Sequence, residues 1–238
     1  MFPLKDDIPT RRAPILTIAL IAINVIVYFA LEQGLWGLGV TGNDVVGEYG
    51  AIPYEITNGE DLPGEAAPFW LTILTSMFLH GSLLHLGGNM LFLWIFGNNI
   101  EDSMGRLTFI AFYLLGGLAA LGLQVATDPD SQVVTIGASG AIAGVLGGYA
   151  RLYPRARVVT IVFIVIFFTI VTLPALLVLG LWFLLQLLPA FSEPVDSAGG
   201  GVAYFAHIGG FLFGVLAIKL FANDVHEDYE RPHRIPVY

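Results

Sequence analysis

Several long stretches of the chain contain almost no charged residue, and this feature limits the possible folds more than any other. Six of them lie at roughly 14–32, 82–100, 107–126, 138–150, 158–188 and 202–222. A helix of about 20 apolar residues can cross a bilayer. Only 12% of the residues are charged, about half of what a soluble domain carries. Because lipid offers the backbone no hydrogen-bond partners, we expect an all-α membrane protein with six transmembrane helices.

The positions of the basic residues favour six spans with both termini in the cytoplasm. In that topology the three outer connections, roughly 33–81, 127–137 and 189–201, contain no Lys or Arg. All 10 basic residues then lie on the inner side, which is the positive-inside pattern. We therefore predict a multi-pass protein of the cell membrane, plasma or inner, embedded in the lipid bilayer. The first outer connection is long enough to carry structure of its own.

This topology divides the chain into three parts. Residues 1–13 should form a cytoplasmic N-terminal segment, 14–222 a six-span domain, and 223–238 a charged, disordered cytoplasmic tail. The start of the chain shows no clear cleavage site for a signal peptide, so we expect the first apolar run to be retained as a span. The run at 158–188 is long for one upright crossing, and we expect a single tilted helix that bends near Pro174.

Four polar residues stand out within the apolar runs: His85, Asn89, Ser139 and His207. Polar groups at membrane depth are functional candidates because hydrocarbon penalises them. Asn89, Ser139 and His207 each precede a charged residue at the cytoplasmic boundary by 12 positions, which corresponds to roughly 18 Å along a helix. The three side chains should therefore lie at one common level in the membrane.

The fourth run, from Ser139 to Arg151, is too short to cross a membrane. Its helix should begin inside the bilayer, where the preceding segment DPDSQVVTIGA dips down to meet it. Non-helical backbone at that depth needs surrounding protein or water, so we expect a wet pocket open to the outer face. The backbone amides of Ala138 and Ser139 at the helix start, with the side chains of His85 and Asn89, are candidate donors to an oxyanion.

Pairs of glycines follow both the serine and the histidine. Small residues four positions apart let helices approach closely, and a Ser139–His207 hydrogen bond requires such an approach. The residues expected to support the site are His80, Gly137, Gly140, Gly144, Gly210 and Gly214. Ser139 would be a nucleophile and His207 its general base. No carboxylate lies near this level in the second, fourth or sixth run, so we expect a catalytic dyad rather than a triad.

Each of these residues also has an ordinary structural explanation when taken alone. The stretch GASG could be a small-residue packing seam, Asn89 an interhelical hydrogen bonder and His207 a bridge between helices. A transporter or channel would instead require charged residues inside the spans. The chain has no cysteine and no zinc-protease motif, so we expect no metal and no organic cofactor. Nucleic acid is not an expected partner.

Taken together, three segments resemble the rhomboid family of intramembrane serine proteases over roughly residues 69–215. They are HGSLLHLGGN with His80, His85 and Asn89, GASGAIAG around Ser139, and AHIGGFLFG around His207. The resemblance implies a six-helix bundle in which Ser139 and His207 hydrolyse transmembrane segments of other proteins near their outer end. It also implies that substrates enter past the second and fifth spans. A catalytically silent relative is the alternative, although such relatives usually lack the serine or the histidine.

Two positions depart from the common family pattern. Many members carry an aromatic residue four positions after the serine, where it packs on the histidine, and here that position is Ala143. Either some other group orients His207, or the Ser139–His207 pair is held more loosely. Many members also carry a Trp-Arg pair in the first outer loop, whereas Trp70 is followed by Leu71. Neither change removes an atom with a predicted catalytic role. The substrate and the oligomeric state are not determined by the sequence.

Overall fold

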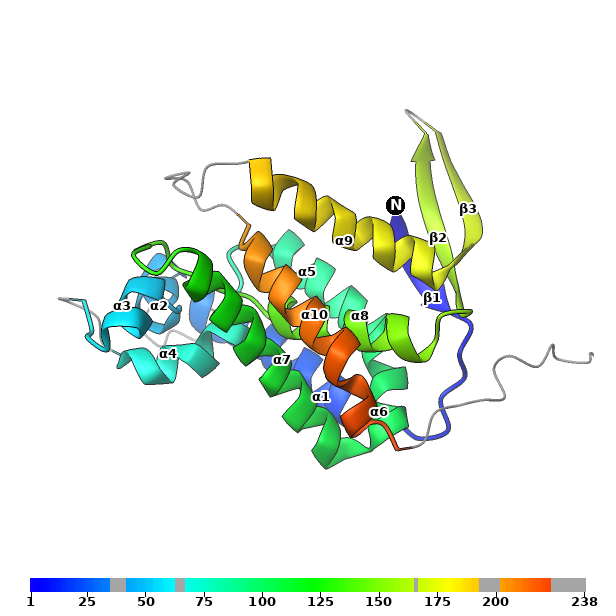
Figure 1. The fold of residues 1–238 in the computed structure, drawn as a ribbon, viewed down its shortest axis with the longest axis horizontal. Helices are drawn as coiled ribbons and strands as arrows, with labels where there is room; N and C mark the ends of the chain where they lie inside the picture. The colour runs from blue at the N-terminus through cyan, green and yellow to red at the C-terminus, as the bar shows by residue number, and fades with distance from the viewer. Residues whose placement is uncertain (35–41, 63–66, 165–166, 193–201, 224–238) are drawn as a thin grey trace, which may run out of the picture.

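The computed structural model describes residues 1–34, 42–62, 67–164, 167–192 and 202–223 as a mainly helical molecule (Figure 1). The helices are α1 (Ile15–Val27, continued by a π-helical turn Tyr28–Glu32), α2 (Gly42–Tyr49), α3 (Pro53–Asn58), α4 (Phe69–Thr75), α5 (Leu83–Phe92), α6 (Asn98–Met104), α7 (Arg106–Thr127), α8 (Ser139–Leu152), α9 (Ala175–Ser192) and α10 (Tyr204–Phe221). A π-helical turn, Leu93–Gly97, joins α5 to α6. The strands are β1 (Phe2–Asp6), β2 (Arg157–Ile164) and β3 (Phe167–Pro174).

The expectation of a single helix over 158–188 is wrong. β2 and β3 form an antiparallel hairpin that projects from the bundle, and α9 begins only after Pro174 (Figure 1). Both strands are rich in Val, Ile, Thr and Phe, residues that favour extended backbone over helix. β1 pairs with β2 and completes a three-stranded sheet. The molecule is therefore mostly, rather than entirely, α-helical.

Several helices are long and apolar enough to cross a membrane. Among the described residues, three meet this criterion outright: Ile15–Glu32, Arg106–Thr127 and Tyr204–Phe221. A fourth candidate is Phe69–Phe78 with Leu83–Met104, two helical stretches that meet at a bend of 77°. α8, with 14 residues, and the apolar stretch of α9 are shorter. The structure is thus that of a membrane protein with several apolar helices, and the count of six spans stays a prediction.

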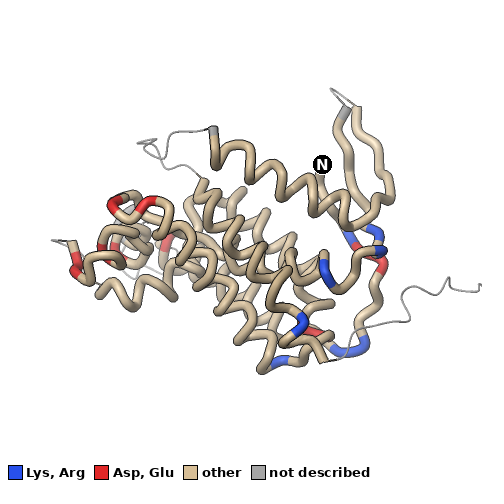
Figure 2. The backbone as a smooth tube through the Cα atoms, in the orientation of Figure 1, with Lys and Arg blue, Asp and Glu red and all other residues tan. Residues whose placement is uncertain are grey.

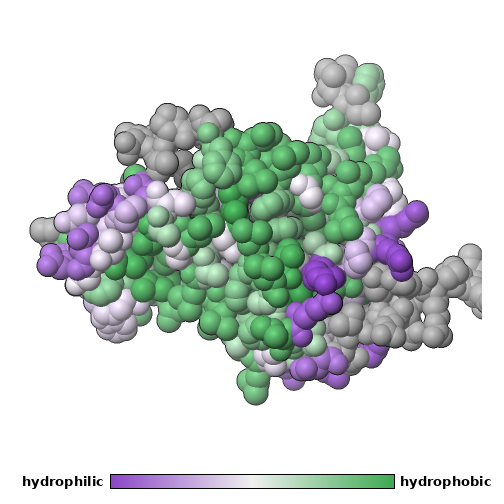
Figure 3. All heavy atoms as spheres, viewed as in Figure 1, coloured by the Kyte–Doolittle hydropathy of each residue, from purple (hydrophilic) through white to green (hydrophobic). Residues whose placement is uncertain are grey.

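The surface is organised along one direction of the molecule. An apolar region covers the middle, and hydrophilic residues gather at the two ends (Figure 3). Lys and Arg residues cluster at one end, whereas acidic residues predominate at the opposite end (Figure 2). The acidic end includes the connection between the first two apolar runs, and the helices α2, α3 and α4 confirm that this connection carries structure of its own. Residues 224–238, which make up nearly all of the predicted tail, lie outside the described residues.

Helix α8 occupies the centre of the bundle and packs mainly on α7 and α10 (Figure 1). Every residue from Gly140 to Tyr149 is buried. A helix surrounded on all sides must be apolar around its whole circumference, and this one consists largely of Gly, Ala and aliphatic residues. Because glycine has no side chain, α10 can approach α8 until its backbone touches that of α8.

The C-terminal end of the second apolar run anchors the first helix. The carboxylate of Glu101 accepts hydrogen bonds from the backbone N–H groups of Leu16 (3.0 Å) and Thr17 (2.8 Å), and from the Thr17 hydroxyl (2.8 Å). α1 has no side-chain cap of its own. Glu101 therefore satisfies amides that the helix leaves unpaired and places a negative charge at the positive end of the helix dipole.

The N-terminal strand is attached to the bundle through Asp6. Its carboxylate accepts hydrogen bonds from the Tyr149 hydroxyl of α8 (2.7 Å) and from the side-chain amide of Asn99. Burial raises the pKa of Asp6 to about 6. The predicted N-terminal segment is thus a structured part of the molecule, joined to the helix that begins with Ser139.

Candidate active site

Ser139 and His207 come from different helices and lie in direct contact. Ser139 is the first residue of α8, and His207 lies in the first turn of α10. The Oγ of Ser139 is 2.7 Å from Nε2 of His207, within hydrogen-bond distance. With the histidine neutral, the contact is an uncharged hydroxyl–imidazole pair. A pair of this kind can activate a serine.

The position of His207 is set by the start of α10. α10 has no side-chain cap from its own sequence, and the backbone N–H of Ala206 donates a hydrogen bond to Oε1 of Gln124 in α7 (3.2 Å). This bond satisfies one of the amides exposed at a helix N-terminus. Gln124 therefore helps to fix the level at which the first turn of α10, and with it His207, lies beside α8.

The second ring nitrogen of His207 also has a partner. Nδ1 lies 2.8 Å from Oε1 of Gln186 in α9. The imidazole ring also lies against the indole of Trp182, with a centroid distance of 5.8 Å. These two α9 side chains contact the histidine in a protein that has the small residue Ala143 four positions after Ser139. Ala143 itself is fully buried and faces Gly210, so the small side chain belongs to the close α8–α10 contact.

A cavity of about 870 Å³ opens beside the pair. Ser139, His207, His85, Asn89 and Gln186 all line it. The volume falls within the range of small-molecule binding clefts. None of the described residues that line this cavity is Asp or Glu, so the histidine has no carboxylate beside it there.

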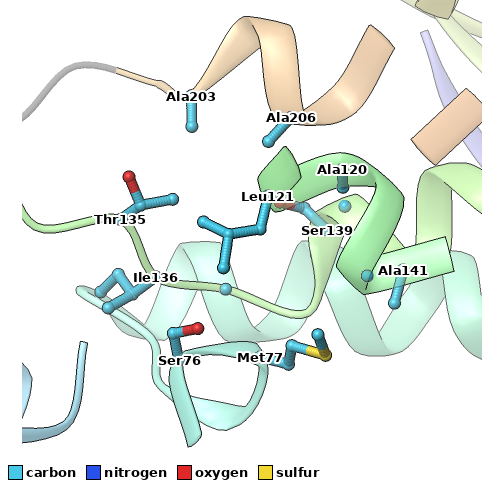
Figure 4. Close-up of a pocket in the computed structure, with 13 residues that line it drawn as sticks. Ser76, Met77, Ala120, Leu121, Thr135, Ile136, Ser139, Ala141, Ala203 and Ala206 are labelled. Atoms are coloured by element: carbon cyan, nitrogen blue, oxygen red, sulfur yellow. The ribbon is translucent and has the colours of Figure 1, made fainter. Parts of the chain in front are cut away.

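A second, much smaller hollow is also lined by Ser139 (Figure 4). Its volume of about 30 Å³ exceeds the roughly 10–15 Å³ that one water molecule needs. Side chains such as Ser76, Met77 and Leu121 surround it, together with Ala203 and Ala206 from the region of α10 (Figure 4). Ser139 therefore lines both cavities, the larger of which opens beside His207.

The predicted donors His85 and Asn89 lie on α5, which borders the large cavity. The side-chain amide of Asn89 donates a hydrogen bond to Nε2 of His80 (3.0 Å). His80 is held in turn by its backbone N–H, which donates to both carboxylate oxygens of Glu32 (3.0 and 3.1 Å). The predicted supporting residue His80 thus positions Asn89, whose amide carries a second N–H.

The backbone before Ser139 is tightly constrained. Gly137 has φ = +121°, a value that residues with a side chain rarely adopt, and its N–H donates to the Ser76 carbonyl (2.8 Å). A Cβ atom at this position would lie 2.9 Å from the imidazole ring of His85. Ala138 is buried and immediately precedes the helix. The amide of Ser139 therefore stands at the start of α8, where no intrahelical acceptor exists for it.

Comparison with known proteins identifies the family. The family model described as the Rhomboid domain matches residues 68–223, which is more than half of the chain. The chain belongs to the rhomboid family. This rhomboid is 32% identical over 157 residues to Rhomboid protein 1, mitochondrial, of Saccharomyces cerevisiae, a match that covers 61% of this chain and 40% of that protein.

Other relatives of this rhomboid come from plants and bacteria. It is 30% identical over 166 residues to RHOMBOID-like protein 5 of Arabidopsis thaliana, covering 69% of this chain and 48% of that protein. It is 33% identical over 141 residues to Rhomboid protease GluP of Bacillus subtilis, covering 59% and 24% respectively. The aligned part of this rhomboid therefore spans less than half the length of each of these relatives.

The polar residues singled out from the sequence of this rhomboid did not include Gln124 and Gln186, which both contact the first turn of α10. Gln186 is the one strongly polar residue in LLVLGLWFLLQLLP, and Gln124 stands near the end of a similar apolar run. The rule that polar groups at depth are functional candidates applies to both, so the signal was present.

Within the described residues, no group of three or more His, Cys, Asp or Glu side chains is arranged to hold a metal ion.

Proposed function

We propose that this rhomboid is an intramembrane serine endopeptidase in which Ser139 is the nucleophile and His207 the general base. The observation that carries the proposal is the 2.7 Å contact between Ser139 Oγ and His207 Nε2 at the edge of a cavity of about 870 Å³. The family relationship supports it, since one relative is named as a rhomboid protease. A hydroxyl–imidazole pair facing an open cleft is suited to acyl transfer.

The reaction divides into acylation and deacylation. Ser139 Oγ attacks the scissile carbonyl carbon as His207 Nε2 takes the hydroxyl proton, and the carbonyl oxygen becomes an oxyanion. Collapse of the tetrahedral intermediate breaks the C–N bond, and His207 returns the proton to the leaving amine. Water then attacks the acyl-enzyme with His207 again as base, which releases the acid product and restores the serine. The step needs neither a metal nor an organic cofactor.

The oxyanion would be held by donors at the start of α8 and on α5. The Ser139 amide lacks an intrahelical acceptor, and the positive end of the helix dipole favours anionic charge there. Asn89 and His85 border the same cavity and can offer side-chain N–H groups. Loss of a single oxyanion donor typically lowers kcat by about 10²–10³-fold.

The substrates would be transmembrane segments of other proteins. α5 and α9 both border the cavity, and Phe92 and Trp182 contact each other between them, with ring centroids 6.4 Å apart. A helix arriving from the bilayer would unwind past this aromatic contact to present its backbone to Ser139. The basic end of the molecule would face the cytoplasm by the positive-inside rule, so cleavage would occur near the outer end of the substrate.

An active-site probe tests the proposal directly. A fluorophosphonate should label the wild-type protein in detergent, and Ser139→Ala should abolish both labelling and cleavage of a transmembrane reporter. His207→Ala should abolish cleavage while the unfolding temperature stays within a few degrees of the wild type. Ser103→Ala, which removes a buried hydroxyl bonded to the Ile100 carbonyl of its own helix, should label normally. Labelling that persists in Ser139→Ala refutes the assignment, and absence of cleavage by the wild type on any transmembrane reporter favours a catalytically silent relative.

A further inference from the structure

The orientation of the Gln186 side chain is fixed by its own backbone neighbour. Its Nε2 lies 3.2 Å from the carbonyl oxygen of Trp182, one helical turn earlier in α9. A carbonyl oxygen only accepts hydrogen bonds, so the NH₂ group of the amide must face it. The other end of the amide, Oε1, then faces Nδ1 of His207 at 2.8 Å.

This orientation determines where the proton of His207 resides. Oε1 of Gln186 only accepts, so Nδ1 of the neutral imidazole must carry the hydrogen that it donates. Nε2 is then unprotonated and can accept a hydrogen bond from the hydroxyl of Ser139, 2.7 Å away. Four groups thus form one directed chain of hydrogen bonds: the Ser139 hydroxyl, the His207 ring, the Gln186 amide and the Trp182 carbonyl.

We propose that Gln186 is the positioning residue of the active site, the neutral counterpart of the carboxylate of a serine-protease triad. The inference rests on the proposed function and names the third member of the same site. A carboxylate in a soluble triad fixes the histidine tautomer and stabilises the imidazolium. Here the amide performs the first task without burying a charge at a depth where an unpaired carboxylate would be costly.

The groups that can orient His207 come from α9. None of the described residues lining the cavity is acidic, and Ala143, four positions after Ser139, is too small to pack a ring on the histidine. Trp182 packs on the imidazole with a centroid distance of 5.8 Å and also contacts Phe211. Trp182 and Gln186 therefore act together, the indole limiting ring rotation and the amide selecting the protonated nitrogen.

Two variants of the full-length protein in detergent micelles separate this role from simple packing. Gln186→Met keeps the approximate length of the side chain but replaces the amide oxygen with a sulfur that accepts hydrogen bonds only weakly. It should lower kcat on a transmembrane reporter roughly ten- to a hundred-fold with little change in KM, as expected when a general base is mispositioned. Gln186→Glu restores an acceptor at the same place. It should recover kcat to within about ten-fold of the wild type. In a plot of kcat against pH, the acidic limb should move to higher pH.

A control on the same helix measures the cost of the substitution itself. Leu185→Met changes an exposed neighbour and should leave kcat within two-fold of the wild type. A kcat for Gln186→Met that also stays within two-fold overturns the proposal. So does a Gln186→Glu variant that is folded, as judged by its unfolding temperature, and no more active than Gln186→Met.

Nitrogen NMR of the wild-type protein tests the same inference without any activity measurement. In protein labelled with ¹⁵N-histidine, the signals of His207 are assigned by their loss in His207→Ala. They should show a protonated Nδ1 and an unprotonated Nε2 at neutral pH, and Gln186→Met should show a mixture of tautomers. A wild-type His207 protonated at Nε2 overturns the proposal even if the variants do not fold. If Ser139→Ala retained cleavage, the proposed function would fail, while this spectrum would still decide the role of Gln186.

Discussion

Gly210 in α10 packs against Gly140 in α8 with no room for a side chain between them. A Cβ atom on Gly210 would overlap the carbonyl oxygen of Gly140, and one on Gly214 would overlap that of Gly144. Ser139 directly precedes the first of these α8 glycines, and His207 lies one turn before Gly210. The close backbone contact therefore sets the separation of the two short side chains that form the candidate dyad.

Substitution of Gly210 by alanine should separate the dyad. The added methyl group must push α10 away from α8, and overpacking of this kind costs about 1–3 kcal/mol of stability. Because the Ser139–His207 hydrogen bond depends on that approach, we expect kcat on a transmembrane reporter to fall more than ten-fold.

The matched control is Gly122→Ala in α7, where an added Cβ would meet nothing within 4 Å. It should retain wild-type activity and an equal or higher unfolding temperature, since alanine favours helix over glycine. Equal activity in Gly210→Ala and Gly122→Ala would show that the α8–α10 contact does not control the site.

Gly137→Ala should damage the oxyanion side of the site. The new Cβ would lie 2.9 Å from the His85 ring, and φ = +121° is strained for any residue with a side chain. We expect kcat to fall at least ten-fold. Gly87→Ala in α5, where a Cβ meets nothing within 4 Å, is the control. Cleavage kinetics and unfolding temperatures of both variants decide the matter, and unchanged kcat in folded Gly137→Ala would contradict the role given to this turn.

Glu101→Gln should loosen the attachment of α1. Glutamine keeps one acceptor oxygen, whereas Glu101 uses both of its oxygens for the amides of Leu16 and Thr17. Loss of a charge-assisted bond to a helix start should reduce the free energy of unfolding by about 1–3 kcal/mol. The same change at Glu48 in α2 serves as the control, with an expected effect within about 0.5 kcal/mol. Equal effects at both sites in denaturant titrations would refute this account of α1.

Attachment of the N-terminal strand should weaken as pH rises. The pKa of Asp6 is raised by burial from 3.8 to about 6, so the folded state favours the protonated carboxyl. The stabilising contribution is complete below pH 4 and is lost as pH rises through 6. Between pH 5 and pH 7 the amides of β1 should therefore lose protection from hydrogen exchange, after correction for the intrinsic rate.

Asp6→Asn tests this assignment because asparagine keeps an oxygen that can accept from Tyr149 and Asn99. In this variant the protection of β1 should no longer depend on pH over that interval. At pH 7 the variant should be at least as well protected as the wild type. A pH dependence that persists in Asp6→Asn would assign the effect to another group.

The class of the protein and its candidate dyad were accessible from the sequence because both rest on local or one-dimensional patterns. Apolar runs reveal membrane helices, and the positions of polar residues within them give approximate depth. The glycines beside Ser139 and His207 indicated a close helix contact in the same way. The hairpin at 157–174 was missed because its residues are as apolar as those of a span, and periodicity does not separate the two.

The sequence by itself determined a rhomboid-like membrane protein with Ser139 and His207 at a common level, since composition and spacing along helices survive folding unchanged. Only the tertiary structure decided what holds them. The partners Gln186 and Trp182 lie on a different helix from either residue, and β1 joins the bundle through Asp6 and Tyr149, which are 143 positions apart. Such contacts depend on how helices rotate and pack against one another, and no local pattern of residues encodes that rotation.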